Sequence, residues 1–175
     1  NGLLRCLFFG IKTPLDFQKR YMRHLVYYVL RKTTTGWSYS FPAALDRKSN
    51  YTFMSNHRDI VLDSAFLCVF LLKAGFSTTV EIAIGDNLLI YPWIKTLVRM
   101  NKAFTVNRGL TPKEMLKSSI HMSQYMHYVI NDKHDNIWIA QREGRAKDSD
   151  DRTQESVLKM LNMGGPTPGK TTAEI

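Results

Sequence analysis

Cysteine is scarce in this sequence, and so are long uninterrupted apolar runs. Cys6 and Cys68 are the only two cysteines and lack C-x-x-C spacing, which argues against a disulfide framework or a structural zinc site and fits a reducing compartment. The best apolar run, residues 64–72, is bounded by Asp63 and Lys73, so it falls short of the ~18–20 residues that span a bilayer. The 175 residues, 44% of them hydrophobic, are enough for one domain with its own core.

Acidic side chains are the other shortage. The chain has 15 Asp and Glu against 24 Lys and Arg, a formal net charge of +9, and its first 48 residues hold nine basic side chains but only Asp16 and Asp46 as acids. Anionic lipid headgroups, nucleic acid and phosphorylated substrates would each satisfy such a field. A solvated basic face remains an equally good interpretation of this charge.

The basic N-terminal part contains a helix start signal. Thr13 can cap a helix that has proline at its first position and Asp16 at its third. Apolar and aromatic side chains then recur at helical spacing. They are Phe17, Tyr21, Leu25 and Tyr28. This amphipathic helix can either lie in a membrane interface or pack on the domain's own core.

Predicted strands and helices alternate from residue 50 onward. We predict strands at 51–54, 78–84, 103–106 and 136–140, and helices at 60–75, 88–100, 111–130 and 154–161. This order is typical of an α/β fold with a mixed, partly parallel sheet flanked by helices.

Three regions follow from these patterns: a basic amphipathic helical segment at residues 1–48, a core at 49–163 and a mobile tail at 164–175. Because the sequence stops without a recognisable closing element, we expect a fragment of a longer protein.

An unusually polar loop follows each predicted strand. The loops are residues 55–59 (SNHRD), 85–87 (GDN), 107–109 (NRG) and 141–145 (QREGR). Ligands of open α/β sheets bind beyond the carboxyl ends of the strands, so these loops should meet at one edge. The first offers an imidazole base and the last two offer guanidinium groups that can hold a phosphate. The pattern predicts a phosphate-binding catalytic edge.

Three of these motifs, in this order, resemble those of the glycerolipid acyltransferases. The matching stretches are residues 53–64 (FMSNHRDIVLDS), 85–87 (GDN) and 142–148 (REGRAKD), and the resemblance covers about residues 50–163. They are most similar to bacterial 1-acyl-sn-glycerol-3-phosphate acyltransferases. The resemblance implies a glycerol-phosphate acyltransferase-like core that is truncated at its C-terminus.

The sequence departs from the family pattern in three places. Five residues separate His57 from Asp63 where the family has four, and Asp59 lies only two residues after the histidine, so either carboxylate can be its partner. The Glu-Gly-Thr-Arg motif lacks its threonine at residues 143–145. The family's fourth motif, a proline-containing apolar strand, is absent.

The resemblance also implies roles for individual residues. His57 would act as the general base, oriented by Asp63 by preference or by Asp59. The residues implied in holding the substrate phosphate are Arg108, Glu143, Gly144 and Arg145. The activity implied is transfer of a fatty acyl group to the hydroxyl of a lysophosphatidate or glycerol-phosphate-type acceptor in phospholipid biosynthesis.

The same resemblance sets the expected partners. Acyl-CoA or acyl carrier protein would be the co-substrate, with no bound cofactor and no nucleic acid. A phospholipid precursor would be the substrate, and acyl carrier protein a partner. The enzyme would sit peripherally on the cytoplasmic face of the cell membrane. We predict no metal, because His121, His127 and His134 are spaced six and seven apart and do not share one helical face.

Two other functions remain open on sequence grounds. Residues 164–171 (GGPTPGKT) fit the pattern of a phosphate-binding loop, which would suit a nucleotide phosphotransferase, although no strand precedes them. A noncatalytic basic module on membranes or nucleic acid is the third hypothesis. A protein kinase is excluded, because the asparagine that should follow Asp59 by five residues is replaced by Ser64.

Overall fold

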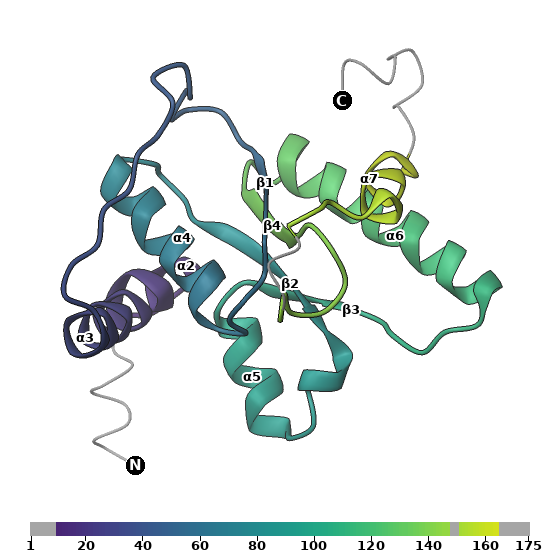
Figure 1. Ribbon diagram of the computed structural model, residues 1–175, viewed down its shortest axis with the longest axis horizontal. Helices are drawn as coiled ribbons and strands as arrows, with labels where there is room; N and C mark the ends of the chain where they lie inside the picture. Colours follow the sequence, from purple (N-terminus) through teal and green to yellow (C-terminus); the bar gives the residue numbers. More distant parts are fainter. Residues whose placement is uncertain (1–9, 148–150, 165–175) are drawn as a thin grey trace.

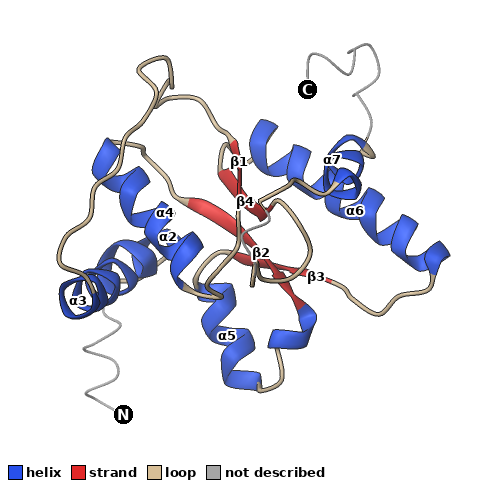
Figure 2. Ribbon diagram, in the orientation of Figure 1, coloured by secondary structure: helices blue, strands red, loops and turns tan. Residues whose placement is uncertain are grey.

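A computed structural model describes residues 10–147 and 151–164 of the chain. The helical elements are α2 Pro14–Phe17, η1 Gln18–Met22, α3 Arg23–Thr33, α4 Leu62–Ala74, η2 Asp86–Leu88, α5 Pro92–Met100, α6 Pro112–Asn131 and α7 Glu155–Asn162. The strands are β1 Thr52–Ser55, β2 Val80–Gly85, β3 Ala103–Val106 and β4 Asn136–Ala140. Strands and helices alternate along the chain (Figures 1 and 2), as the sequence predicted.

The four strands form one sheet in the order β1-β4-β2-β3. All three pairings are parallel, with Phe53 opposite Trp138, Ile82 opposite Trp138 and Ala83 opposite Phe104. The α/β class is therefore confirmed, and the parallel pairing expected for part of the sheet extends through all of these strands. The carboxyl ends of the strands share one edge.

Helices cover both faces of this sheet (Figure 1). On one face α4 contributes Cys68 and Leu71 to a core with Val80 and Trp138. On the other face α6 and α7 pack on side chains of β4, and their shared core is Met126, Val129, Ile137, Ile139 and Met160. Neighbouring residues of β4 thus enter opposite cores, as the period of two in a strand requires.

The buried residues of the N-terminal helix are not all those that the sequence pattern predicted. Phe17 is buried and stacks on Tyr21, with ring centroids 5.7 Å apart, whereas Leu25 and Tyr28 are exposed. Residues 18–22 form a π-helical turn between α2 and α3, and a wider turn of this kind changes the direction of every later side chain. Downstream of it Val26 and Leu30 are the residues that pack against α4.

Predicted helix ends agree with the structure where capping residues fix them. Thr13 and Thr111 both form capping boxes, and Gly75 ends α4 in the left-handed conformation at φ 93°. Helix α5 begins at Pro92 rather than at residue 88, because the residue before a proline is held in extended backbone, here Tyr91 at φ −111° and ψ 143°. None of the described helices is both long and apolar enough to cross a membrane.

Candidate functional site

The polar loops that follow the four strands lie together at the carboxyl edge of the sheet. The Gln141 N–H donates to the Ser55 carbonyl at 2.9 Å, and the Ala146 N–H donates to the His57 carbonyl at 2.7 Å, which joins the loops after β1 and β4. The Arg108 N–H donates to Asp86 Oδ2 at 3.2 Å, which joins the loops after β2 and β3. These hydrogen bonds join the four loops in two pairs.

His57 and Asp63 form a contacting pair within this edge. His57 Nδ1 lies 2.9 Å from Asp63 Oδ2. The same carboxylate oxygen accepts from the peptide N–H groups of Arg58 at 2.7 Å and Asp59 at 3.0 Å. Asp63 stands in the first turn of α4, so a helix and the loop before it hold the carboxylate in place. The imidazole is thereby oriented through Nδ1, and its Nε2 points away from the carboxylate.

Asp59, the other candidate partner of the histidine, has a different role. Its Oδ1 accepts from the N–H groups of Val61 at 2.9 Å and Leu62 at 2.8 Å, so it caps the start of α4. These backbone donors hold the pKa of Asp59 below its ordinary value, and the positive charge of Arg145 lowers the pKa further. Of the two carboxylates, Asp63 is the one in contact with the imidazole.

Trp138 is a neighbour of His57 that the sequence did not indicate. The two rings meet edge to face, with centroids 5.5 Å apart, and Trp138 Nε1 donates to Ser55 Oγ at 2.9 Å. The imidazole therefore has Asp63 at one nitrogen and a buried indole against its ring. Strand alternation places residue 138 on the α4 face of β4, but the pairing of β1 with β4, which brings it near His57, is tertiary.

The predicted phosphate-binding residues lie along the same edge, but they do not form one cluster of contacts. Arg108 Nη1 is 3.8 Å from Glu143 Oε1, and both side chains are largely exposed. The Arg108 guanidinium also lies over Gly85, where an added Cβ would come within 2.7 Å of Nε. Arg145 acts on Asp59 at the histidine loop, and Gly144 before it has φ 74°. These residues thus form two groups: Arg108 with Glu143, and Arg145 close enough to Asp59 of the histidine loop to lower its pKa.

Residues that follow the loop after β4 also lie at this edge. No local sequence pattern predicted their position. Asn56 Nδ2 donates to Asp151, and Gln141 Nε2 donates to the Asp151 carbonyl at 2.6 Å. The Glu143 N–H donates to Gln154 Oε1 at 3.0 Å. The segment before α7 therefore returns to the site and fixes the shape of the loop that carries Glu143.

An apolar cavity of about 360 Å³ adjoins the histidine loop. Its walls come from the N-terminal helix, α4, β2 and α5, and include Val26, Val61, Val69, Ile84, Ile94 and Leu97. Arg23 is the one charged residue in its lining, while Gln18, Ser64 and Asn101 add polar groups. Ile60 and Val61 lie between His57 and Asp63 in sequence and line the cavity, whereas His57 itself is not among the lining residues.

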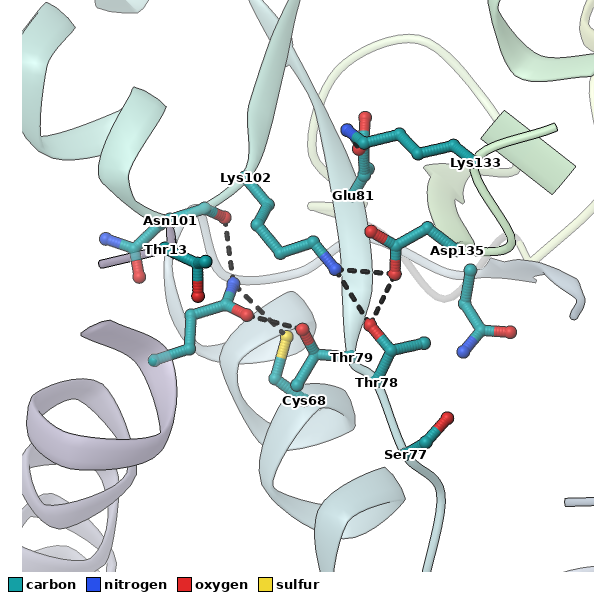
Figure 3. Close-up of polar contacts among 12 residues, drawn as sticks. Thr13, Cys68, Ser77, Thr78, Thr79, Glu81, Asn101, Lys102, Lys133 and Asp135 are labelled. Atoms are coloured by element: carbon teal, nitrogen blue, oxygen red, sulfur yellow. Dashed lines mark hydrogen bonds and ion pairs between the residues drawn. The ribbon is translucent and has the colours of Figure 1, made fainter. Parts of the chain in front are cut away.

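The opposite, amino edge of the sheet holds a second polar cluster, which the sequence analysis missed (Figure 3). Lys102 Nζ lies 2.6 Å from Asp135 Oδ1 and 3.0 Å from Thr78 Oγ1. Glu81 is 2% exposed, pairs with Lys133 and accepts from the Tyr125 hydroxyl at 2.6 Å. Each charge has a partner of opposite sign, which is what burial requires. The one indication of this cluster in the sequence was Glu81, a charged residue within a predicted strand.

Burial changes the acidity of two groups around this cluster. Desolvation raises the pKa of the Cys68 thiol to about 11, so the thiol stays protonated at neutral pH. Desolvation, followed by the hydrogen bond to Glu81, also raises the pKa of Tyr125. Neither group is prepared for acid–base chemistry near neutral pH, and the amino edge is a structural element that ties the starts of β2, β3 and β4 together.

Other predicted features lie outside this site or outside the described residues. Within residues 10–147 and 151–164, the structure gathers no group of three side chains able to hold a metal ion. Of the phosphate-binding-loop pattern at 164–171, Gly164 alone is described; its N–H donates to Ser123 Oγ at 2.7 Å. The remainder of that pattern, and of the predicted tail, lies outside the described residues.

Comparison with protein-family models, with curated proteins and with solved structures finds no match to this chain.

Proposed function

We propose that this chain is an acyltransferase that moves a fatty acyl group from acyl-CoA or acyl carrier protein to the free hydroxyl of a lysophosphatidate or glycerol-phosphate-type acceptor, in phospholipid biosynthesis. The observation that carries the proposal is the His57 Nδ1 contact with Asp63 Oδ2 at 2.9 Å, on an edge flanked by Arg108 and Arg145 and beside an apolar cavity. Base, cation and apolar cavity are the three things that this substrate pair requires.

His57 supplies the acid–base step of the reaction. With Nδ1 facing Asp63, Nε2 is the nitrogen that takes the proton from the acceptor hydroxyl as that oxygen attacks the thioester carbonyl carbon. The tetrahedral intermediate collapses with cleavage of the carbon–sulfur bond, and the thiolate leaves with the proton that His57 returns. Asp63 fixes the tautomer and stabilises the imidazolium while it exists.

The arginines bind the acceptor and take no part in cleavage of the thioester bond. Guanidinium groups bind phosphate oxygens in pairs of parallel hydrogen bonds, so Arg108 and Arg145 hold the acceptor phosphate on either side of the histidine. Arg108 contacts Glu143 at 3.8 Å and lies over Gly85, where the absence of a side chain leaves room for the guanidinium. A phosphate held there places the hydroxyl of a short glycerol backbone near Nε2.

The cavity suits the acyl chain of the donor. Its volume of about 360 Å³ falls in the range of small-molecule pockets, ~300–1,000 Å³, and its lining is mostly aliphatic. Because Ile60 and Val61 join it to the histidine loop, a chain lying in it would present its thioester carbonyl to His57. The acceptor and the product are amphipathic lipids, so we place the enzyme peripherally on a membrane, at its cytoplasmic face.

The direct test compares the full-length protein with its His57→Ala variant in an assay with acyl-CoA and lysophosphatidate. We expect the variant to lose a factor of about 10²–10⁴ in kcat, the usual contribution of a positioned base. His121→Ala is the matched control, because His121 is an exposed histidine of α6; it should retain wild-type activity.

Two outcomes would overturn the proposal. Equal acyl transfer by wild type and His57→Ala would remove the histidine from the chemistry. Lipid binding by the folded wild-type protein without any acyl transfer would instead favour a noncatalytic basic membrane module.

A further inference from the structure

Exposed apolar side chains surround the mouth of the apolar cavity. Ile60, Val61, Trp93 and Leu97 are exposed and also line the cavity, and the exposed Ile90 and Tyr91 come just before Pro92, the first residue of α5. We call this set the rim: Ile60, Val61, Ile90, Tyr91, Trp93 and Leu97. Ile90 is 74% exposed and Trp93 is 64% exposed. Grouped exposure of this kind is uncommon on soluble proteins and marks an interaction surface.

The rim is exposed because α5 uses only part of its apolar surface inside the protein. Ile94 and Val98 are half buried, while Trp93 and Leu97 lie one residue earlier and are exposed. An isolated apolar residue on a surface needs no explanation, but Trp93 and Leu97 share one apolar face of α5 with Ile94 and Val98. The part of this face that Trp93 and Leu97 form is left exposed by the described residues.

The charges around the rim favour an anionic partner. Arg23 is the one charged residue of the cavity lining, and Arg58, two residues before Ile60, is exposed. The carboxylate closest to the rim in sequence is Asp59, whose oxygen already accepts from the Val61 and Leu62 N–H groups. Asp59 keeps its negative charge and Asp63 adds another, but Lys95 and Arg99 of α5 are also exposed, so four cations stand near the rim against two carboxylates.

We propose that the rim docks on an anionic bilayer, with Tyr91 and Trp93 at the headgroup level and the aliphatic rim residues among the acyl chains. Amphipathic aromatic rings prefer that level, and basic residues near it are attracted to anionic lipid. The cavity mouth then opens directly into hydrocarbon. A protein partner would cover the rim equally well, but it would close the cavity instead of giving an acyl chain a dry path into it.

This assignment rests on the proposed function for its choice of a lipid partner, yet docking can be measured without catalysis. The probe is co-sedimentation of the full-length protein with vesicles of phosphatidylcholine alone and with vesicles that also contain phosphatidylserine. We expect tighter binding to the second kind, weakened by salt. Inactive His57→Ala should bind as wild type does, so failure of docking and failure of the proposed chemistry are distinguishable.

The decisive variant is the pair Ile90→Ser and Tyr91→Ser. Both side chains are exposed, and Tyr91 makes no side-chain capping bond at α5, so the fold should survive. Because transfer of apolar side chains from water into hydrocarbon is favourable, we expect the double variant to lose more than about tenfold in vesicle affinity. Leu25→Ser with Tyr28→Ser is the matched control, since those residues of α3 are similarly exposed outside the rim.

Three results would overturn the proposal. Failure of the wild-type protein to co-sediment with either kind of vesicle would exclude bilayer docking. A rim variant that binds like wild type, or an α3 variant that loses as much affinity, would place the membrane contact elsewhere. Self-association that depends on Ile90 and Tyr91, measured by light scattering without vesicle binding, would make the rim an interface between two copies of the chain.

Discussion

The two edges of this sheet contain similar residue types in opposite circumstances. At the carboxyl edge His57, Asp63 and Arg108 are partly exposed, and only one nitrogen of the imidazole faces its carboxylate. At the amino edge Lys102 and Glu81 are buried, and each has partners of its own. The contrast teaches that charge alone does not mark a site: groups with remaining capacity for a ligand lie at one edge, and groups that satisfy one another lie at the other.

The largest expected effect is on chemistry at the carboxyl edge. Asp63→Asn should lower kcat by about 10²–10⁴-fold, because the amide cannot hold the same tautomer or stabilise the imidazolium. The measurement is acyl transfer at saturating substrate, with Asp59→Asn as control. A loss at Asp59 equal to that at Asp63 would contradict the geometry, in which Asp63 alone of the two touches the imidazole.

The complementary change at the amino edge should affect stability and leave chemistry intact. Lys102→Met removes one partner of a buried pair and leaves Asp135 without its cation, which typically costs about 3–5 kcal/mol. Urea unfolding measures the loss, and kcat per folded molecule should stay at its wild-type value. The double variant Lys102→Met with Asp135→Leu should recover part of the stability, since it removes the stranded charge; no recovery would mean that the pair is not the stabilising unit.

A smaller effect is expected for the acceptor site. Arg108→Ala should lower kcat/KM for the phosphorylated acceptor by about 10–100-fold, because a hydrogen bond to a charged group contributes ~1.5–3 kcal/mol. Arg108→Lys should recover only part of this, since lysine keeps the charge but not the paired donors. Lys113→Ala, an exposed cation at the start of α6, is the matched control. Equal effects at 108 and 113 would reduce the site to general charge attraction.

The smallest effect is expected at Asp59. This residue lies at the carboxyl edge, but we expect its replacement to lower the free energy of unfolding and not the activity. Asp59→Ala removes the cap of α4 and should cost about 1 kcal/mol. The folded-state pKa of Asp59 is lowered, so its contribution is present above the unfolded carboxyl pKa and is lost as pH falls through the lower, folded value. Unfolding measured across acidic pH should therefore show wild type and variant converging; a constant difference would exclude the charged cap.

Local chemistry explains why much of the fold was predictable. Capping boxes at Thr13 and Thr111, the glycine at 75 and the apolar runs fixed most elements, because each depends on neighbours within one or two turns. The π-turn at residues 18–22 was not predictable from periodicity. The sequence pattern predicted Leu25 and Tyr28 on the same helix face as Phe17. Because of the π-turn they lie on the surface instead.

What the sequence by itself determined is the α/β order of elements and the polar loops after each strand, since alternation and loop composition are local properties. Only the tertiary structure decided between Asp63 and Asp59, brought Trp138 and Asp151 to the site, and paired Lys102 with Asp135. The His57–Asp63 contact depends on the first turn of α4, and the other contacts depend on strand order, which fixes distances between residues far apart in the chain. Local patterns carry no information about such distances.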